Sequence, residues 1–430
     1  MSDDSYDQTT GDRTMSNVQH SSQPREEDSG VEDTKVEPRA VPRTTPRSSH
    51  LSTRRRNIWF LLIVLLLGVV TIVALGSGGA RPSGQANVTQ STTPPTTATK
   101  TQSTTPQALT GTGEFREYPL PQSDSQMMRP ATDHEGRIWF GEMGRNFLAV
   151  FDPRSQAFQQ MTPPRGHYGV MSVQVASDDT IWFVEQYANY IGHYFPTTGH
   201  YQVYPLPMLS VPDPSHAGKT LTLPSAPNEL VLDAHGTVWF TEFNADALGR
   251  LDPHTGLMRH YPLSARRSVQ KLIPYGVTVD QEGMIWFTEV NAGRIGRLDP
   301  VTGRIHLFTS SRPELSPMEI ASDAQGNIWV TSFSGGLLLR LDPRSGTFTS
   351  YEAPFSGPGT GGLYGLIVTP TGEIWVTVLA ENVVARLDVV AHRFIYYAIP
   401  TPGSEPLGIV MGVNHTLWFT EVDRIGMLRP

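Results

Sequence analysis

The 430-residue sequence contains no cysteine, so disulfide bonds and thiolate metal sites are excluded. It also has no excess of positive charge. Its 33 Lys and Arg are outnumbered by 41 Asp and Glu, which gives a net charge of −8 at pH 7. The basic surface typical of nucleic-acid binding is therefore missing, and we expect no nucleic-acid partner. No long apolar stripe at helical spacing occurs beyond residue 112, which excludes a helical solenoid.

Long hydrophobic runs are missing too, with one exception at residues 58–75. This stretch of 18 residues carries no charge, and at about 1.5 Å per residue it just crosses a hydrocarbon core of roughly 30 Å. Arg54, Arg55 and Arg56 precede it, and only Arg81 follows closely. The positive-inside rule predicts one transmembrane helix over 57–76 in the cell membrane, with a cytoplasmic N-terminus and an extracellular remainder. A cleavable signal peptide is the alternative, although the run is long for one and lies far from the start of the chain.

Two polar segments flank this run. Residues 1–56 are rich in Ser, Asp, Glu, Thr and Pro and lack hydrophobic periodicity. They cannot bury enough apolar surface to offset their chain entropy, so we predict a disordered cytoplasmic tail. Residues 77–112 are rich in Ser, Thr, Pro and Gly, which is typical of a flexible linker. The lipid bilayer is thus one expected partner, and the folded part is predicted over 113–430.

Seven of the eight tryptophans recur at similar intervals beyond residue 112. The intervals are 43, 57, 47, 43, 46 and 43 residues. A period in the forties, built from short strands, predicts an all-β fold, a seven-bladed β-propeller. Seven repeats also argue against a six-bladed lactonase-type enzyme. The residues that mark the repeat are Trp139, Trp182, Trp239, Trp286, Trp329, Trp375 and Trp418.

Each repeat reads as four short strands joined by tight turns. An apolar strand leads to an Asp-x-x-Gly turn, then to Ile-Trp-Phe-Thr-Glu or a variant, then to Ile-Gly-Arg-Leu, and finally to a strand with Tyr-Pro-Leu. The last repeat stops after its third strand at 424–428, and an unpaired fourth-strand sequence stands at 115–120. We therefore predict that this N-terminal strand completes the last blade and closes the ring, which removes exposed sheet edges.

Two positions of the repeat are expected at one mouth of the central channel, because the start of the first strand and the end of the second are antiparallel neighbours. The first position lies eleven residues before each Trp, and the second lies three residues after it. The first holds Met128, Met171, Asn228, Tyr275, Met318, Tyr364 and Leu407, and the second holds Glu142, Glu185, Glu242, Glu289, Ser332, Val378 and Glu421.

The five glutamates of the second position allow two interpretations. Like charges gathered at one mouth need a cation, a hydrogen-bond donor or a raised pKa, and oxygen ligands suit a divalent metal. A structural role, in which the glutamate is a feature of the repeat that satisfies backbone amides or Arg partners, is favoured for Glu142, Glu185, Glu242 and Glu289. Glu421 is more evenly balanced, because Glu405 belongs to the same blade and is expected at the same edge.

The repeated Ile-Trp-Phe-Thr-Glu, Arg-Ile-Gly-Arg-Leu-Asp-Pro and Tyr-Pro-Leu sequences, as at 285–289 and 294–300, resemble the virginiamycin B lyase (streptogramin lyase) family over about residues 113–430. The resemblance implies a seven-bladed propeller and elimination chemistry, assisted by Mg²⁺, that opens the ester ring of streptogramin B depsipeptides. Such chemistry needs a general base and a group that stabilises the enolate. By position, Glu405 and Glu421 match the carboxylates on the metal side of the family's site.

Three other family positions are changed in this chain. Leu407 stands where the family has its catalytic His, Tyr364 stands at a second active-site His, and Met128 stands at a Tyr. Leucine cannot take a proton, and a tyrosine with a pKa near 10 is a poor base.

Two functions follow from these residues. In the first, the chain is an extracytoplasmic lyase, with Glu421 and Tyr364 as catalytic candidates and Glu405, Tyr275, Leu407 and Met128 against the substrate. In the second, the mouth binds a small-molecule, peptide or protein ligand without catalysis. Glu405 and Glu421 favour the enzyme, and Leu407 and Tyr364 favour the binding protein. A monomer is expected in either case.

Overall fold

The computed structural model describes residues 109–164, 169–212, 216, 218–263, 271–312, 315–353 and 362–430. The predicted tail, the apolar run at 58–75 and the linker up to residue 108 lie outside the described residues. Within the described ranges, no helix is long and apolar enough to cross a membrane.

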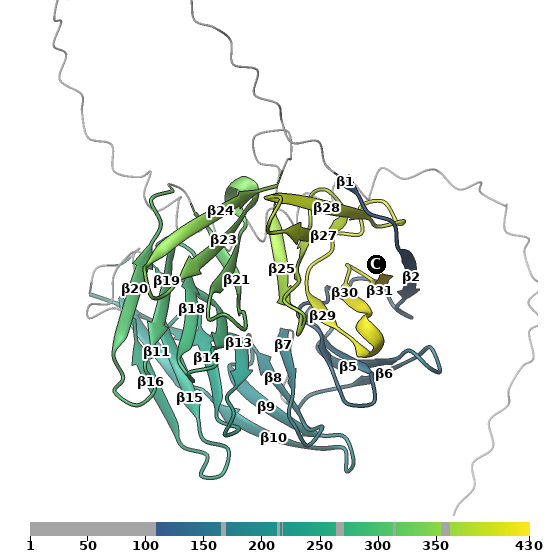
Figure 1. The fold of residues 1–430 in the computed structure, drawn as a ribbon. Helices are drawn as coiled ribbons and strands as arrows, with labels where there is room; N and C mark the ends of the chain where they lie inside the picture. Colours follow the sequence, from purple (N-terminus) through teal and green to yellow (C-terminus); the bar gives the residue numbers. More distant parts are fainter. Residues whose placement is uncertain are drawn as a thin grey trace, which may run out of the picture. The chain divides into compact units, whose positions relative to one another are not determined.

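The described chain forms seven blades around a centre, each with four antiparallel strands, which confirms the predicted propeller (Figure 1). Blade 1 comprises β3 (Ala131–Thr132), β4 (Ile138–Glu142), β5 (Phe147–Asp152) and β6 (Ala157–Met161). Blade 2 comprises β7 (Val170–Val175), β8 (Ile181–Glu185), β9 (Tyr190–Phe195) and β10 (His200–Pro205). Blade 3 comprises β13 (Pro227–Leu232), β14 (Val238–Glu242), β15 (Ala247–Leu251) and β16 (Met258–Pro262). Blade 4 comprises β17 (Pro274–Val279), β18 (Ile285–Glu289), β19 (Arg294–Leu298) and β20 (Ile305–Thr309).

The remaining blades follow the same order. Blade 5 comprises β21 (Pro317–Ser322), β22 (Ile328–Ser332), β23 (Leu337–Asp342) and β24 (Thr347–Glu352). Blade 6 comprises β25 (Leu363–Val368), β26 (Ile374–Val378), β27 (Val383–Asp388) and β28 (Arg393–Ala398). Blade 7 comprises β29 (Ile409–Met411), β30 (Leu417–Thr420), β31 (Arg424–Arg429) and β2 (Glu114–Pro119). Two short 3-10 helices, η1 (Ser334–Gly336) and η2 (Val413–His415), lie between strands.

The ring closes as predicted. The N-terminal strand β2 pairs antiparallel with β31, with Phe115 opposite Leu428 and Glu117 opposite Gly426. A second N-terminal pairing was not predicted: β1 (Leu109–Thr110) runs parallel to β28 and makes blade 6 five-stranded. The N-terminal segment of the propeller is therefore tied to two adjacent blades, 6 and 7.

In four of the seven blades, one aspartate carboxylate links the Asp-x-x-Gly turn to the tryptophan of the repeat. In blade 4, Asp280 Oδ1 accepts hydrogen bonds from the backbone N–H groups of Glu282 and Met284, both at 2.9 Å. Asp280 Oδ2 accepts one at 2.7 Å from the indole N–H of Trp286. The same aspartate-to-indole bond occurs in blades 1, 3 and 5. The repeat motif is thus a device that fixes the turn and the core tryptophan together.

Steric contact with a neighbouring ring explains why glycine occupies the second position of Ile-Gly-Arg-Leu. A Cβ atom at Gly296 would lie 2.0 Å from Cζ of Phe287 on the neighbouring strand. Gly192, Gly249 and Gly426 meet the phenylalanine of their own blades in the same way. In these four blades the phenylalanine ring occupies the space that a side chain at the glycine position would need.

A ring of threonine hydroxyls joins successive blades. Thr288 Oγ1 accepts a hydrogen bond from Gly276 N–H of its own blade and donates one to the Met318 carbonyl of the next blade, both at 2.8 Å. Blades 1 and 2 have Gly141 and Val184 at this position instead. The threonines that form both bonds are Thr241, Thr288, Thr331, Thr377 and Thr420.

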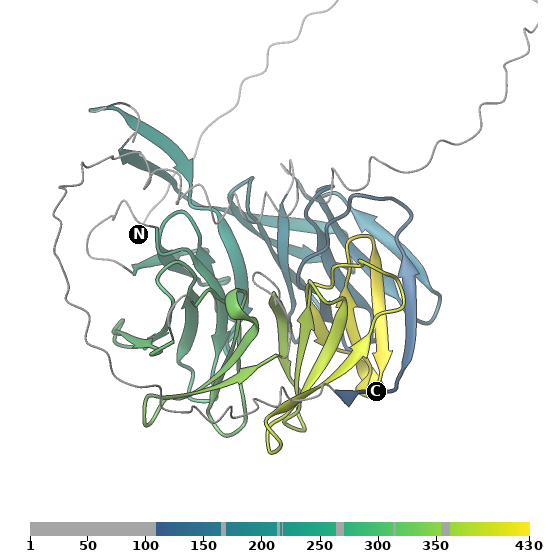
Figure 2. The same cartoon turned by 90° about the horizontal axis from the view of Figure 1, so that it is seen from above.

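The long 57-residue interval between Trp182 and Trp239 contains an extra hairpin, β11 (Met208–Pro212) with β12 (Thr220–Pro224). It forms its own two-stranded sheet and projects from the blades (Figure 2).

Candidate functional site

A β-bulge shapes the channel-facing end of the first strand. In blade 4, Pro274 is opposite Glu289 and Val277 is opposite Phe287, so two residues of the first strand, Tyr275 and Gly276, share the single residue Thr288 on the second. Blades 3, 5 and 6 show the same irregularity. Bulges re-aim side chains, and this one turns the first predicted position of the repeat toward the axis.

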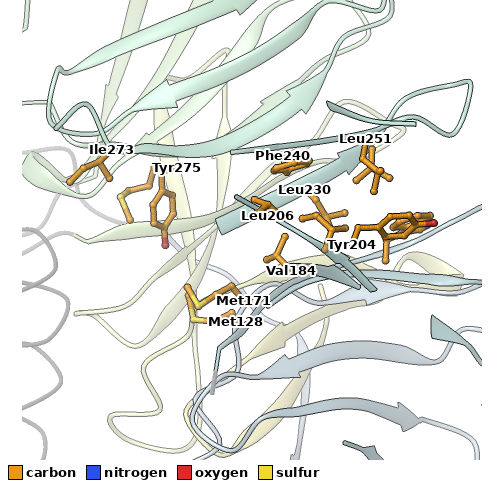
Figure 3. Close-up of a cluster of buried hydrophobic side chains, with 14 of the residues drawn as sticks. Met128, Met171, Val184, Tyr204, Leu206, Leu230, Phe240, Leu251, Ile273 and Tyr275 are labelled. Carbon is orange, nitrogen blue, oxygen red and sulfur yellow. The ribbon is translucent and has the colours of Figure 1, made fainter. Parts of the chain in front are cut away.

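The side chains at that position pack together, as the repeat predicted. Met128, Met171, Tyr275, Met318 and Tyr364 are buried in one cluster, and Leu407 is half-buried against it. Figure 3 shows Met128, Met171 and Tyr275 within this cluster. Four of the predicted site residues, Met128, Tyr275, Tyr364 and Leu407, therefore belong to one apolar assembly drawn from four blades.

The two tyrosine hydroxyls of this assembly are hydrogen-bonded to each other. The Tyr275 and Tyr364 side chains are almost fully buried, at 8% and 2% exposure. Burial raises the pKa of both phenols, that of Tyr364 well above its usual value. Neither hydroxyl is available as a base near neutral pH.

A buried ion cluster that the sequence did not reveal lies directly beneath the tyrosines. Arg129 Nε lies 2.9 Å from Glu319 Oε1 and 3.3 Å from Glu229 Oε1, so three blades are joined. The guanidinium stacks on the Tyr275 ring, 4.8 Å from its centroid. Each of these three charged residues stands ten residues before the Trp of its own blade, directly after the inner-ring position of the repeat. The irregular pairing of the first strand brings the side chains to the axis.

The positive charge of Arg129 and the negative charges of Glu229 and Glu319 hold this cluster together. Burial alone would lower the pKa of Arg129, but the carboxylates of Glu229 and Glu319 outweigh it and hold that pKa well above its usual value. Burial raises the pKa of the Glu229 carboxyl, and Arg129 opposes that shift. Arginine stays charged at any ordinary pH, so the cluster is a permanent polar plug under an apolar layer.

The floor of the mouth above this plug is apolar. Besides Leu407, the half-buried residues that pack against the cluster include Met143, Phe243 and Phe333. Each of these three residues directly follows the last residue of the second strand in its blade, which is β4, β14 or β22. They therefore stand at the predicted mouth and offer partly exposed apolar surface.

The predicted glutamates are buried at the ends of the second strands, each with an exposure of 0–1%. Three have partners in their own blade. Gln160 donates to Glu142 at 2.5 Å, His260 Nδ1 lies 2.5 Å from Glu242 Oε1, and Arg294 Nε donates to Glu289 at 2.7 Å. These three glutamates therefore have structural partners. The Arg partner that we predicted occurs at Glu289, while Gln160 and His260 take that place at Glu142 and Glu242.

Glu185 and Glu421 differ from the other three. Their carboxylate oxygens accept no hydrogen bond of normal geometry from the described residues. Burial raises the pKa of each to about 8. Next to Glu421 lie Ser404 and Glu117, and the second carboxyl adds to the shift in its pKa.

Glu405 and Glu421 lie on adjoining segments. Val422 N–H donates to the Ser404 carbonyl at 3.0 Å, and Leu407 N–H donates to the Thr420 carbonyl at 2.9 Å. Glu405 is half-buried and has a left-handed backbone, with φ of 54°. In the part of the chain that the structure describes, no three His, Asp or Glu side chains form a metal-binding group. Two carboxylates completed by water are nonetheless an ordinary set for Mg²⁺.

The fold and the mouth define a closed seven-bladed propeller with an apolar surface over a charged plug. Comparison with known proteins supports the resemblance seen in the sequence: residues 311–430, which hold blades 5 to 7, match the virginiamycin B lyase family. No curated protein matches the chain.

Solved structures extend the similarity to the whole propeller. A streptogramin B lyase is 26% identical with a TM-score of 0.64, over 74% of this chain and 97% of that one. Virginiamycin B lyase from Staphylococcus aureus is 25% identical with the same TM-score, over 74% and 100%. A catalytically inactive histidine-to-alanine variant of that enzyme was solved with quinupristin. An extracellular domain assigned to a two component system of B. thetaiotaomicron, 16% identical with a TM-score of 0.54 over 72% of this chain and 42% of that one, shares the fold alone.

Proposed function

We propose that this virginiamycin B lyase-like propeller binds an amphipathic ligand comparable with quinupristin at its mouth and does not open it. The observation that carries this proposal is the composition of the inner ring. The inner ring is the set of side chains that stand eleven residues before each Trp. Three of them, Met128, Tyr364 and Leu407, replace active-site residues of the family and pack in one apolar cluster. An apolar pocket floor with few polar groups is typical of ligand sites.

The chemistry of these residues argues against elimination. Proton abstraction needs a positioned base whose pKa is near the working pH. Leu407 and Met128 carry no titratable group, and the Tyr364 hydroxyl is buried against Tyr275. Of these three positions, Leu407 is half-buried and offers contact surface, while Met128 and Tyr364 are buried in the apolar layer around it.

A second candidate function is the lyase reaction with Glu421 as the base. The observation in its favour is the buried Glu421 carboxyl, whose pKa is raised to about 8, since a base with a pKa near neutrality suits proton abstraction. Glu405 would then be the carboxylate left to hold Mg²⁺, which would supply an electrophile for the carbonyl oxygen. The Glu421 side chain, however, faces Ser404 and Glu117 of its own blade.

Both candidates are tested by incubating the full chain with quinupristin and Mg²⁺. Elimination conserves mass, so the linear product is identified by its chromatographic retention and fragment ions, with the S. aureus lyase as positive control. Calorimetry measures binding in parallel. Binding without ring opening is expected. Ring opening that is lost in Glu421→Gln would establish the second candidate, and the absence of saturable binding would contradict the first.

We also propose that the chain is held in the cell membrane by residues 58–75, with the propeller outside. The support is the uncharged run itself, the preceding Arg54, Arg55 and Arg56, and the Ser/Thr/Pro-rich linker. Carbonate extraction should leave the full chain in the membrane pellet, and protease added to intact cells should release the propeller. Recovery of the chain in the supernatant, or protection of the propeller in intact cells, would refute this topology.

A further inference from the structure

A groove separates the outer strands of blades 2 and 3. Its volume is about 640 Å³, and its walls come from β10 with the residues after it and from β16 with the preceding turn. Tyr204 and Leu206 form one wall, and Met258 and His260 form the other. Tyr204 and Leu206 also belong to the buried cluster of Figure 3, so this wall of the groove is continuous with the core.

The side chain of His260 brings a titratable group to this largely apolar groove. His260 Nδ1 is hydrogen-bonded to Glu242, whose side chain is only 1% exposed, while the His260 side chain is 33% exposed. The second ring nitrogen, Nε2, has no partner among the described residues. That hydrogen bond raises the pKa of His260 above its ordinary value, against the effect of burial. A protonated ring presents an Nε2–H donor to the groove.

The corresponding positions in other blades show that histidine is not needed for the fold. In blade 1, Gln160 stands opposite Ala149 as His260 stands opposite Gly249, and it donates to Glu142 in the same manner. An uncharged amide thus satisfies this buried glutamate. Blade 3 instead has a group that adds a positive charge and a second donor, facing the groove.

We propose that the groove between blades 2 and 3 is a second binding site, for a small molecule that joins an apolar body to a carboxylate. The apolar body would lie against Tyr204, Leu206 and Met258, and the carboxylate would accept the hydrogen bond from His260 Nε2. Glu242 acts as a positioning residue, because it fixes the ring and holds its charge. The site is separate from the mouth, which is formed by the first and second strands.

The test uses the full chain and octanoate, with octan-1-ol as the neutral probe of equal chain length, both measured by calorimetry. Octanoate is expected to bind saturably, and octan-1-ol about tenfold more weakly, since hydrogen bonds to charged groups are the stronger ones. His260→Gln copies the Gln160 arrangement of blade 1, so it should fold normally and weaken octanoate binding about tenfold. Glu242→Gln should weaken it as well.

The matched control is His306→Gln, an exposed histidine of the outer strand β20 that does not line the groove. It should bind octanoate like the unchanged chain. Met258→Glu offers a second variant that keeps His260 and places a repelling charge in the groove, and it should abolish binding. No octanoate binding, equal binding of octan-1-ol, or undiminished binding by His260→Gln or Met258→Glu would overturn the proposal.

Discussion

Replacing Thr288 by valine tests the hydrogen bonds that join the blades. The side chain is fully buried, and valine has nearly the same shape, so the change removes a hydroxyl without opening a cavity. It leaves the Gly276 N–H and the Met318 carbonyl, each 2.8 Å from the hydroxyl oxygen, without that partner. Each buried unsatisfied group costs about 1–3 kcal/mol, so we expect a loss of about 2–5 kcal/mol in the free energy of unfolding.

The assay is urea unfolding of the full chain followed by tryptophan fluorescence. Thr309→Val is the matched control, because Thr309 is exposed on the outer strand β20 and surface changes usually stay within about 0.5 kcal/mol. If Thr288→Val unfolds at the same urea concentration as Thr309→Val, the hydroxyl ring contributes nothing and the reasoning is refuted.

Three further predictions follow from buried polar groups. Arg129→Met should destabilise the propeller by about 3–5 kcal/mol, since it leaves buried carboxylates uncompensated; adding Glu319→Met should restore part of the loss in thermal unfolding, and no rescue would count against the ion cluster. Glu421, with a folded pKa of about 8 above its unfolded value, binds a proton in the folded state that the unfolded chain has released. Stability should therefore fall between about pH 4.5 and 8, by up to about 1.4 kcal/mol per pH unit from this group, and Glu421→Gln should flatten that fall. Asp280→Ala should cost about 2–4 kcal/mol through the lost turn and indole bonds, and an unchanged Trp286 environment in fluorescence would contradict it.

The repeat made the fold predictable. The tryptophan interval set the number of blades, and the unpaired strand at Phe115 set the closure, because both are periodic features of the chain. The two-residue strand at Leu109 was missed, since so short a parallel pairing leaves no pattern in composition. The inner ring was also predictable from spacing, as shown by Tyr275 and Leu407.

The charged plug was not predictable by the same reasoning. Arg129, Glu229 and Glu319 come from three different blades. In the blades of Glu229 and Glu319, a bulge places two residues of the first strand opposite one residue of the second and so changes which side chain faces the axis. The partners of the glutamates were equally hidden, because Glu242 and His260 are joined across the width of one blade. Contacts that cross blades or depend on a local irregularity leave no periodic trace in the sequence.

The most direct measurement of the central claim is the affinity of the full chain for quinupristin before and after Leu407→Arg, determined by calorimetry with His306→Gln as control. If the mouth is a binding surface, the unchanged chain and the control should bind with equal affinity and leave the ligand intact, while Leu407→Arg should bind at least about tenfold more weakly because it places a charge on an apolar floor. Undiminished binding by Leu407→Arg, or recovery of the opened ring from the unchanged chain, would contradict the account.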